Sequence, residues 1–161
     1  MPRVLSALSL ALLAGCPPEI EDPPVGKAEF DCGIGNHAGQ DWAPLDGENA
    51  EMTLGFQGFL FVPFRLQATD APAVLDAQMS LKPRGQDAIA GEQPQVLFTC
   101  EGSICLTPDV MFFLEGSSLD PYLGETADIT VRIEDAAVYC ITSAHVTLVN
   151  DECDPNMESC P

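Results

Sequence analysis

Alternation of apolar and polar side chains predicts β-strands along the middle of the chain. The clearest example is residues 58–68 (GFLFVPFRLQA), in which every second side chain belongs to one apolar set. A period of two places alternate side chains on opposite faces of a strand, so this set is expected to face a core. Its members are Leu60, Val62, Phe64, Leu66 and Ala68. Pro63 has no N–H to donate to a ladder, which indicates an edge strand or a bulge at that point.

Shorter segments of the same kind follow along the chain. The further predicted strands are residues 50–54, 74–81, 95–99, 104–107, 110–114, 127–133, 137–141 and 145–149. Turns rich in Gly, Pro and Asp separate them, and helical periodicity is scarce. Residues 55–58 are expected to turn between the first two strands, and residues 100–105 (CEGSIC) to form a hairpin whose cysteines face each other. This pattern predicts a single all-β domain, an antiparallel β-sandwich, over residues 29–150.

The segments that flank this domain differ from it in composition. Residues 17–27 (PPEIEDPPVGK) contain four prolines and three acids, so residues 16–28 are expected to form a disordered, extended tether. Residues 151–161 (DECDPNMESCP) are expected to form an acidic tail. The oxygen-bearing side chains of that tail are Asp151, Glu152, Asp154, Asn156 and Glu158. They lack the spacing and central glycine of an EF-hand, so a solvated tail is favoured over a calcium site.

The start of the chain has the pattern of an export signal. Arg3 supplies a positive charge, and residues 4–13 are apolar apart from two serines. As a helix, this run would cross only about half of a bilayer, so a transmembrane span is not expected. The small residues Ala14 and Gly15 then mark a cleavage site.

The sequence Leu13-Ala14-Gly15-Cys16 resembles the lipobox of bacterial lipoproteins, in which an aliphatic residue and two small ones precede a cysteine. The resemblance implies removal of residues 1–15 by the lipoprotein signal peptidase and acylation of Cys16, which would anchor the chain to a membrane. Pro17 stands where an aspartate holds some lipoproteins in the inner membrane, so the outer membrane is the expected location. An ordinary signal peptide that ends near a cysteine is the alternative.

The cysteine count agrees with lipidation of Cys16. The chain has seven cysteines, and removal of this one from the count leaves an even set. In an exported chain such a set predicts three disulfides with fifteen possible connectivities, and free thiols are the alternative. The candidates are Cys32, Cys100, Cys105, Cys140, Cys153 and Cys160.

Acidic residues dominate the charge of the chain. Six Lys and Arg residues stand against 25 Asp and Glu residues, for a formal net charge of −19. Loss of residues 1–15 would remove Arg3 and leave five against 25, a balance of −20. Nucleic acid and anionic lipid headgroups repel such a chain, so no nucleic-acid partner is expected.

Residues 44–47 (PLDG), residues 55–58 (GFQG) leading into a strand that ends at Arg65, and residues 124–135 (GETADITVRIED) form a second set of motifs. Together they resemble a group of uncharacterised bacterial lipoproteins with immunoglobulin-like sandwich domains. The resemblance covers most of residues 29–150 and implies an immunoglobulin-like sandwich and an exported location. It implies no catalytic residue.

Candidate catalytic chemistry is sparse. The chain has two histidines, His37 and His145, and no HExxH, P-loop, GxSxG or CxxC motif. No catalytic residue and no cofactor is therefore assigned, and an enzyme is not expected. The alternative is a cupredoxin-like copper electron carrier, with Cys140 and His145 at a turn into the last strand and His37 as a second nitrogen ligand. Against it, no methionine follows His145 at once, and a ligand role for Cys140 would break the disulfide parity.

Phe59 and Phe61 lie on the second face of the strand at residues 58–68 and are a candidate ligand-contacting pair, unless a neighbouring loop or sheet covers them. Taken together, these patterns predict an exported, outer-membrane-anchored lipoprotein with an envelope-structural, adhesion or binding role. Its ligand would be a protein or a polysaccharide, and loops at one end of the sandwich are the expected binding surface.

Overall fold

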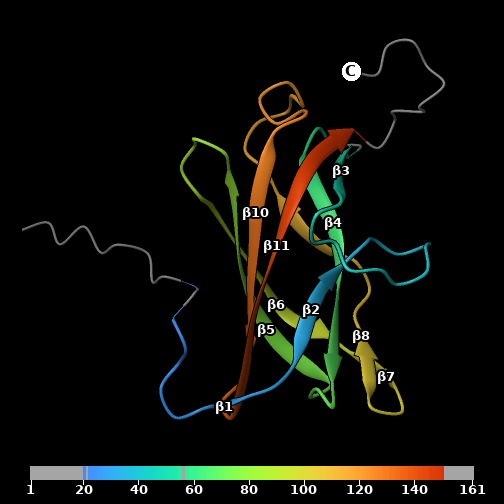
Figure 1. The fold of residues 1–161 in the computed structure, drawn as a ribbon, viewed down its shortest axis with the longest axis vertical. Coiled ribbons are helices and arrows are strands. Elements are labelled where there is room, and N and C mark those ends of the chain that lie inside the picture. Colours follow the sequence, from blue (N-terminus) through green and yellow to red (C-terminus); the bar gives the residue numbers. More distant parts are fainter. Residues whose placement is uncertain (1–19, 21, 56, 151–161) are drawn as a thin grey trace, which may run out of the picture.

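The computed structural model describes residues 20, 22–55 and 57–150, and within them the chain forms eleven strands and no helix (Figure 1). The strands are β1 (Ala28–Glu29), β2 (Cys32–Gly35), β3 (Asn49–Leu54), β4 (Leu60–Thr69), β5 (Val74–Pro83), β6 (Ile89–Leu97), β7 (Thr99–Glu101), β8 (Ile104–Leu106), β9 (Val110–Phe113), β10 (Thr126–Glu134) and β11 (Val138–Asn150). The prediction of an all-β sandwich is confirmed. The immunoglobulin-like subtype stays a prediction. In the described part of the chain, no helix has the length and apolar character needed to cross a membrane.

The strands form two layers that share one connecting strand (Figure 1). One layer has the antiparallel order β6-β5-β10-β11, and β1 pairs with β11 in parallel. The other is centred on β4, with β2 and β3 on one side of it, β8 and β9 on the other, and β7 beyond β8. β3 connects the layers, because its first part pairs with β11 and its last two residues pair with β4.

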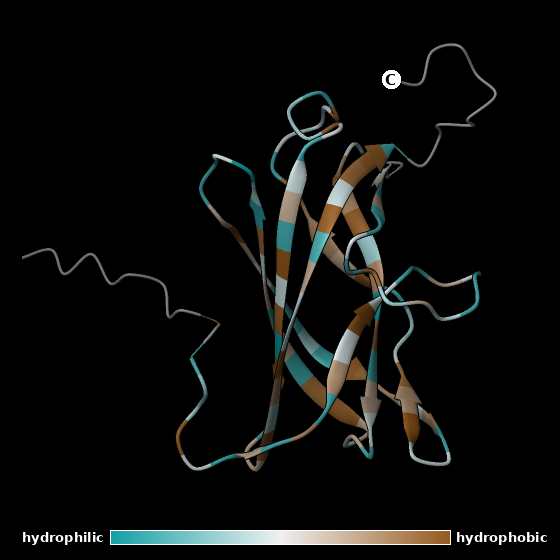
Figure 2. Ribbon diagram, in the orientation of Figure 1, coloured by the Kyte–Doolittle hydropathy of each residue, from teal (hydrophilic) through white to brown (hydrophobic). Residues whose placement is uncertain are grey.

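Apolar side chains from both layers meet in one core. The predicted inward face of β4 is fully buried, and Figure 2 shows the alternation of apolar and polar residues as bands along β10 and β11. The largest fully buried side chains are Phe64, Phe112, Met52, Leu60, Leu66, Leu75, Met79, Leu81, Ile129, Ile133, Leu148 and Val62. Each buried side chain of this size contributes about 1.5–3 kcal/mol relative to exposure, so this core is the main source of stability.

Pro63 lies in a strand that is paired on both sides, at a gap in the pairing. The carbonyls of Leu60 and Leu66 accept backbone hydrogen bonds from residues that follow β9 and β8. Backbone groups alternate sides along a strand, so the nitrogen of Pro63 faces the opposite side, towards β2 and β3. On that side, pairing with β3 ends at Phe61 and pairing with β2 starts at Arg65. The proline therefore removes no ladder bond, although β4 is not an edge strand.

The last strand corrects one prediction. The expected strands at 137–141 and 145–149 are one continuous strand, β11, which pairs with β10 from Tyr139 to Thr147. The intervening Thr142, Ser143 and Ala144 had suggested a turn. Instead, Ala144 is buried in the core, and the hydroxyl of Ser143 lies 3.0 Å from that of Thr130 on β10.

Sequence periodicity missed three other features. β1 and β2 are short, and β2 contains two glycines, so neither has a readable pattern. β6 starts at Ile89 rather than at residue 95, because it is an edge strand whose side chains are mostly exposed. The positive φ of Gln95 and a register shift opposite it, between Leu75 and Ala77, also interrupt its alternation.

The described part of the expected tether lies against the sandwich. The Nζ atom of Lys27 is 2.6 Å from a carboxylate oxygen of Glu134, and a guanidinium nitrogen of Arg132 donates to the carbonyl of Asp22. Residues 1–19, including Cys16 and the signal sequence, and residues 151–161, including Cys153, Cys160 and the tail acids, lie outside the described residues.

Candidate binding surface

The outer face of β4 and β9 carries exposed aromatic side chains. Phe59 is 58% exposed and Phe113 is 55% exposed. The ring centroid of Phe113 is 6.4 Å from that of Phe59 and 6.0 Å from that of Phe61, and the first pair is edge-to-face. Met111, on the same face of β9, is 42% exposed. We call Phe59, Phe61, Met111 and Phe113 the aromatic face.

Strand register and a glycine turn assemble this face. Phe61 is opposite Phe113 in the β4–β9 ladder, and Pro63 is opposite Met111. Directly before β4, the amide of Gly55 donates to the carbonyl of Phe59 over 2.8 Å, and Gly58 has a φ of 78°. Glycine adopts that left-handed conformation at little cost, so the predicted GFQG turn holds Phe59 in line with the strand.

The second face of this strand is partly covered. Of the two candidate contact residues, Phe59 has more than half of its surface open within the described structure, whereas Phe61 is half-buried. The contribution of β9 was not predicted, because residues 110–114 are all apolar and show no period. This candidate binding surface is a sheet face, whereas the sequence analysis predicts a binding surface on the loops at one end of the sandwich.

Carboxylates flank the aromatic face. Side chains two residues apart on a strand share a face, so Asp109, Met111, Phe113 and Glu115 form one row along β9 and its flanks. Asp109 is half-buried and accepts a hydrogen bond from the amide of Ala38, whereas Glu115 is exposed. The surroundings of the aromatic face are therefore acidic.

Arg65 lies farther along the same face of β4, enclosed by the loop that follows β2. Its guanidinium donates to the carbonyl and side-chain oxygens of Asn36 over 3.0 and 2.9 Å, and to the carbonyl of Gln40 over 3.0 Å. The cation also lies 5.9 Å from the ring centroid of Trp42. These contacts fix the loop beside the aromatic face and occupy three of the five N–H donors of the arginine.

The structure does not bring His37, Cys140 and His145 together. Cys140 points into the core and forms a disulfide with Cys32. His145 follows five residues later on the opposite, exposed face of β11, roughly 16 Å along the strand, and its Nδ1 lies 2.8 Å from an Asp128 carboxylate oxygen. His37 lies 3.0 Å from Glu51 on β3. The copper alternative required a free Cys140 at a turn, and the continuous strand and the disulfide remove both conditions.

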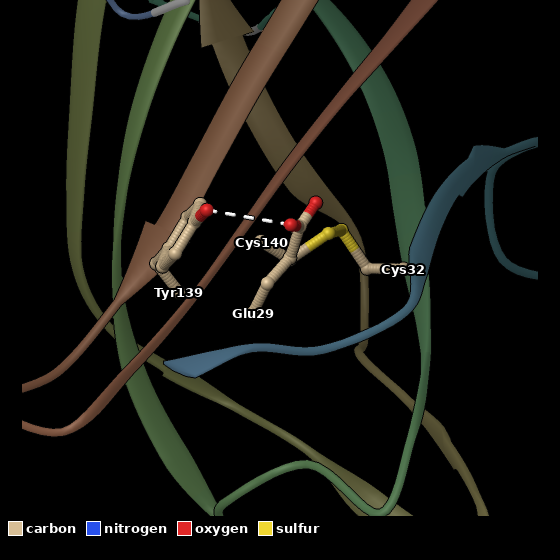
Figure 3. The surroundings of a disulfide bond; sticks show 4 residues. All are labelled: Glu29, Cys32, Tyr139 and Cys140. Atoms are coloured by element: carbon tan, nitrogen blue, oxygen red, sulfur yellow. Dashed lines mark hydrogen bonds between the residues drawn. A yellow bond between two sulfur atoms is a disulfide. The ribbon is translucent and has the colours of Figure 1, made fainter. Parts of the chain in front are cut away.

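The predicted hairpin at residues 100–105 is confirmed, with its two cysteines paired. Cys100 and Cys105 are directly opposite in the β7–β8 ladder and form a disulfide. Cys32 and Cys140 form the other described disulfide, and Figure 3 shows it between β2 and β11, beside a hydrogen bond from Tyr139 to Glu29. Within the described residues, no group of three or more His, Cys, Asp and Glu side chains is placed to hold a metal ion.

No family model matches the chain, and neither the curated proteins nor the solved structures include a match to it.

Proposed function

We propose that this protein is a non-catalytic, lipid-anchored binding module of the bacterial envelope, and that its aromatic face docks a protein partner. The observation that carries the proposal is the exposure of Phe59, Phe113 and Met111 as one cluster on an open sheet face. Clustered apolar side chains of this size on a soluble surface mark interaction sites, whereas scattered ones do not.

The arrangement of the rings favours a protein over a polysaccharide. Sugar rings stack on aromatic faces, but the Phe59 and Phe113 rings meet at 83° and so do not form a flat platform. Met111 adds a flexible side chain of the kind enriched in the cores of protein interfaces. The aromatic face therefore resembles an interface core that an apolar side chain of a partner can enter.

Charge specifies the partner further. The aromatic face is flanked by Asp109 and Glu115, and the whole chain has a net charge of −19. An acidic rim favours a partner whose apolar patch is bordered by Lys or Arg, and it disfavours anionic polymers. We therefore expect a basic protein surface as the occupant.

Site-specific photo-crosslinking in native host cells tests this function. A photo-reactive amino acid replaces Phe59 in one strain and Ala90 in another, where Ala90 is an exposed residue of β6 in the other layer. We expect a discrete crosslinked protein with the probe at residue 59 and none with the probe at residue 90. The captured protein is then purified, and its affinity for the isolated module is measured.

Two variants of that module separate the aromatic face from general hydrophobicity. Phe59→Ser/Phe113→Ser is expected to raise the Kd by at least about tenfold, because central aromatic side chains dominate interface energies. Val74→Ser/Leu97→Ser removes two comparably exposed apolar side chains that lie opposite each other on β5 and β6, and it should leave the Kd unchanged. Equal effects of the two variants, or crosslinking only to polysaccharide, would overturn the proposal.

A further inference from the structure

A pocket of about 380 Å³ opens on the outer face of the other layer, at one end of β5, β10 and β11. It is lined by Lys82, Arg84, Thr126, Ala127, Asp128 and His145. None of these residues belongs to the aromatic face, so the pocket is a separate feature of the sandwich.

Strand register aligns the polar groups of this pocket. Lys82 is opposite Asp128 in the β5–β10 ladder, and Asp128 is opposite His145 in the β10–β11 ladder. The backbone amide of Arg84 donates to the carbonyl of Thr126 over 2.8 Å. Residues two apart on a strand share a face, so both cations lie on the same side of the sheet as the histidine and the threonine.

The two cations of the pocket differ from the other cations of the sandwich. Lys27 and Arg132 both pair with Glu134, and Arg65 is enclosed by its loop. Among the ion pairs of the described residues, none includes Lys82 or Arg84. A chain with 25 acids and six Lys and Arg residues thus places two cations side by side without a carboxylate partner of their own.

Asp128 does not cancel this positive charge. One of its oxygens lies 2.8 Å from Nδ1 of His145, which leaves Nε2 as the remaining polar atom of that ring. With a neutral imidazole, the formal charge of Lys82, Arg84 and Asp128 together is +1. A monoanion would neutralise the pocket, and a dianion would do so with a proton on the imidazole.

We propose that this pocket binds a small oxyanion, a carboxylate or a phosphate group. The Arg84 guanidinium presents a planar fork of donors that matches either group, and the Lys82 ammonium adds a point charge. The hydroxyl of Thr126 supplies a neutral donor. Asp128 holds the imidazole of His145 through Nδ1. Nε2 then accepts a hydrogen bond from a phosphate hydroxyl when the ring is neutral, and donates to an oxyanion oxygen when the ring is protonated.

Carboxylates have two sources here, a free small molecule and the acids of residues 151–161, which follow β11 in the sequence. Titration of inorganic phosphate into the full-length chain carrying Cys16→Ser tests whether the pocket binds an oxyanion. Comparison of variants then distinguishes a free anion from the carboxylates of the tail. The readouts are calorimetry and the NMR signals of the His145 ring and of the Thr126 and Asp128 amides, at low ionic strength, with chloride as the reference anion.

Four proteins are compared: the reference chain, Lys82→Gln/Arg84→Gln, Lys27→Gln, and a chain whose tail acids Asp151, Glu152, Asp154 and Glu158 are replaced by their amides. Lys27→Gln is the matched control, because it removes one cation at the other end of β10. We expect saturable phosphate binding that Lys82→Gln/Arg84→Gln weakens by at least about tenfold and Lys27→Gln leaves unchanged.

If the reference chain binds phosphate, the pocket takes a free anion. If phosphate binds only when the tail acids are neutralised, the carboxylates of the chain's own tail occupy the pocket. Absence of binding in all four proteins, or binding that Lys82→Gln/Arg84→Gln does not weaken, would refute an oxyanion pocket.

Discussion

Cys32 of β2 and Cys140 of β11 are 108 residues apart in sequence, and their disulfide joins the two layers of the sandwich (Figure 3). By contrast, Cys100 and Cys105 are five residues apart and close a single hairpin. In the chain-entropy model, the stabilisation by a cross-link increases with the logarithm of the number of residues in the loop that it closes. The two disulfides are therefore expected to contribute unequally.

Removal of each disulfide tests this inequality. The model gives about 5 kcal/mol for the loop between Cys32 and Cys140 and about 2 kcal/mol for the hairpin. We expect Cys32→Ser/Cys140→Ser to lower the denaturant midpoint far more than Cys100→Ser/Cys105→Ser does, as measured by chemical unfolding. Equal losses would mean that native-state packing, rather than loop closure, sets both contributions.

Gly35 is required by the position of Trp42. A Cβ atom at residue 35 would lie 2.2 Å from the Trp42 ring, so the ring must move when Ala replaces this glycine. Overpacking of this kind costs about 1–3 kcal/mol. We expect Gly35→Ala to lower the unfolding free energy by that amount and to shift the emission of Trp42, which is the one tryptophan of the chain.

Gly33 supplies the control for this substitution. It lies on the same face of β2, two residues earlier, and no atom is within 4 Å of its ideal Cβ position. Gly33→Ala should leave both the stability and the emission of Trp42 nearly unchanged. A similar loss in both variants would assign the effect to strand flexibility instead of the ring contact.

Asp135 makes part of the stability depend on pH. Its carboxylate accepts hydrogen bonds from the amides of Ala137 and Val138 in the turn between β10 and β11, and these hold its pKa below the ordinary value of 3.8. A depressed folded-state pKa stabilises the fold above the unfolded-state pKa, and this stabilisation is lost as pH falls through the folded-state pKa.

The substitution Asp135→Asn keeps a side-chain oxygen but removes the charge. We expect it to be less stable than the parent chain at about pH 7, and this difference in stability to narrow at about pH 2, because the parent carboxylate takes up a proton as the pH falls through its folded-state pKa. Thermal unfolding at both pH values measures the two differences. If the difference in stability between the two chains is the same at both pH values, the charge of Asp135 does not cause that difference.

The long strands could be predicted from sequence because one of their faces is apolar and the other is mixed. β4, β5 and β10 all show this alternation, and each was found within a few residues of its ends. β11 was split in two because Thr142 and Ser143 suggested a turn, whereas a sheet accommodates their hydroxyls through cross-strand contacts. Local polarity is thus a weak signal when the neighbouring strand supplies partners.

Both surface sites depend on register, which periodicity does not reveal. The apposition of Phe61 and Phe113 requires β9 to pair with β4, and the row through Lys82, Asp128 and His145 requires three strands in order. The partner of Cys32 was one of many possibilities for the same reason. Sequence reasoning identified residue types at these places, but the fold determines which of them meet.

The lipobox resemblance leads to the last prediction. If Cys16 carries acyl chains, Cys16→Ser should abolish incorporation of radiolabelled palmitate and move the protein from the membrane fraction to the soluble fraction of native host cells. Cys100→Ser/Cys105→Ser is the matched control, because it also removes thiols but leaves the lipobox intact. It should keep both the label and the membrane fractionation. A parent chain that is exported without label would favour an ordinary signal peptide.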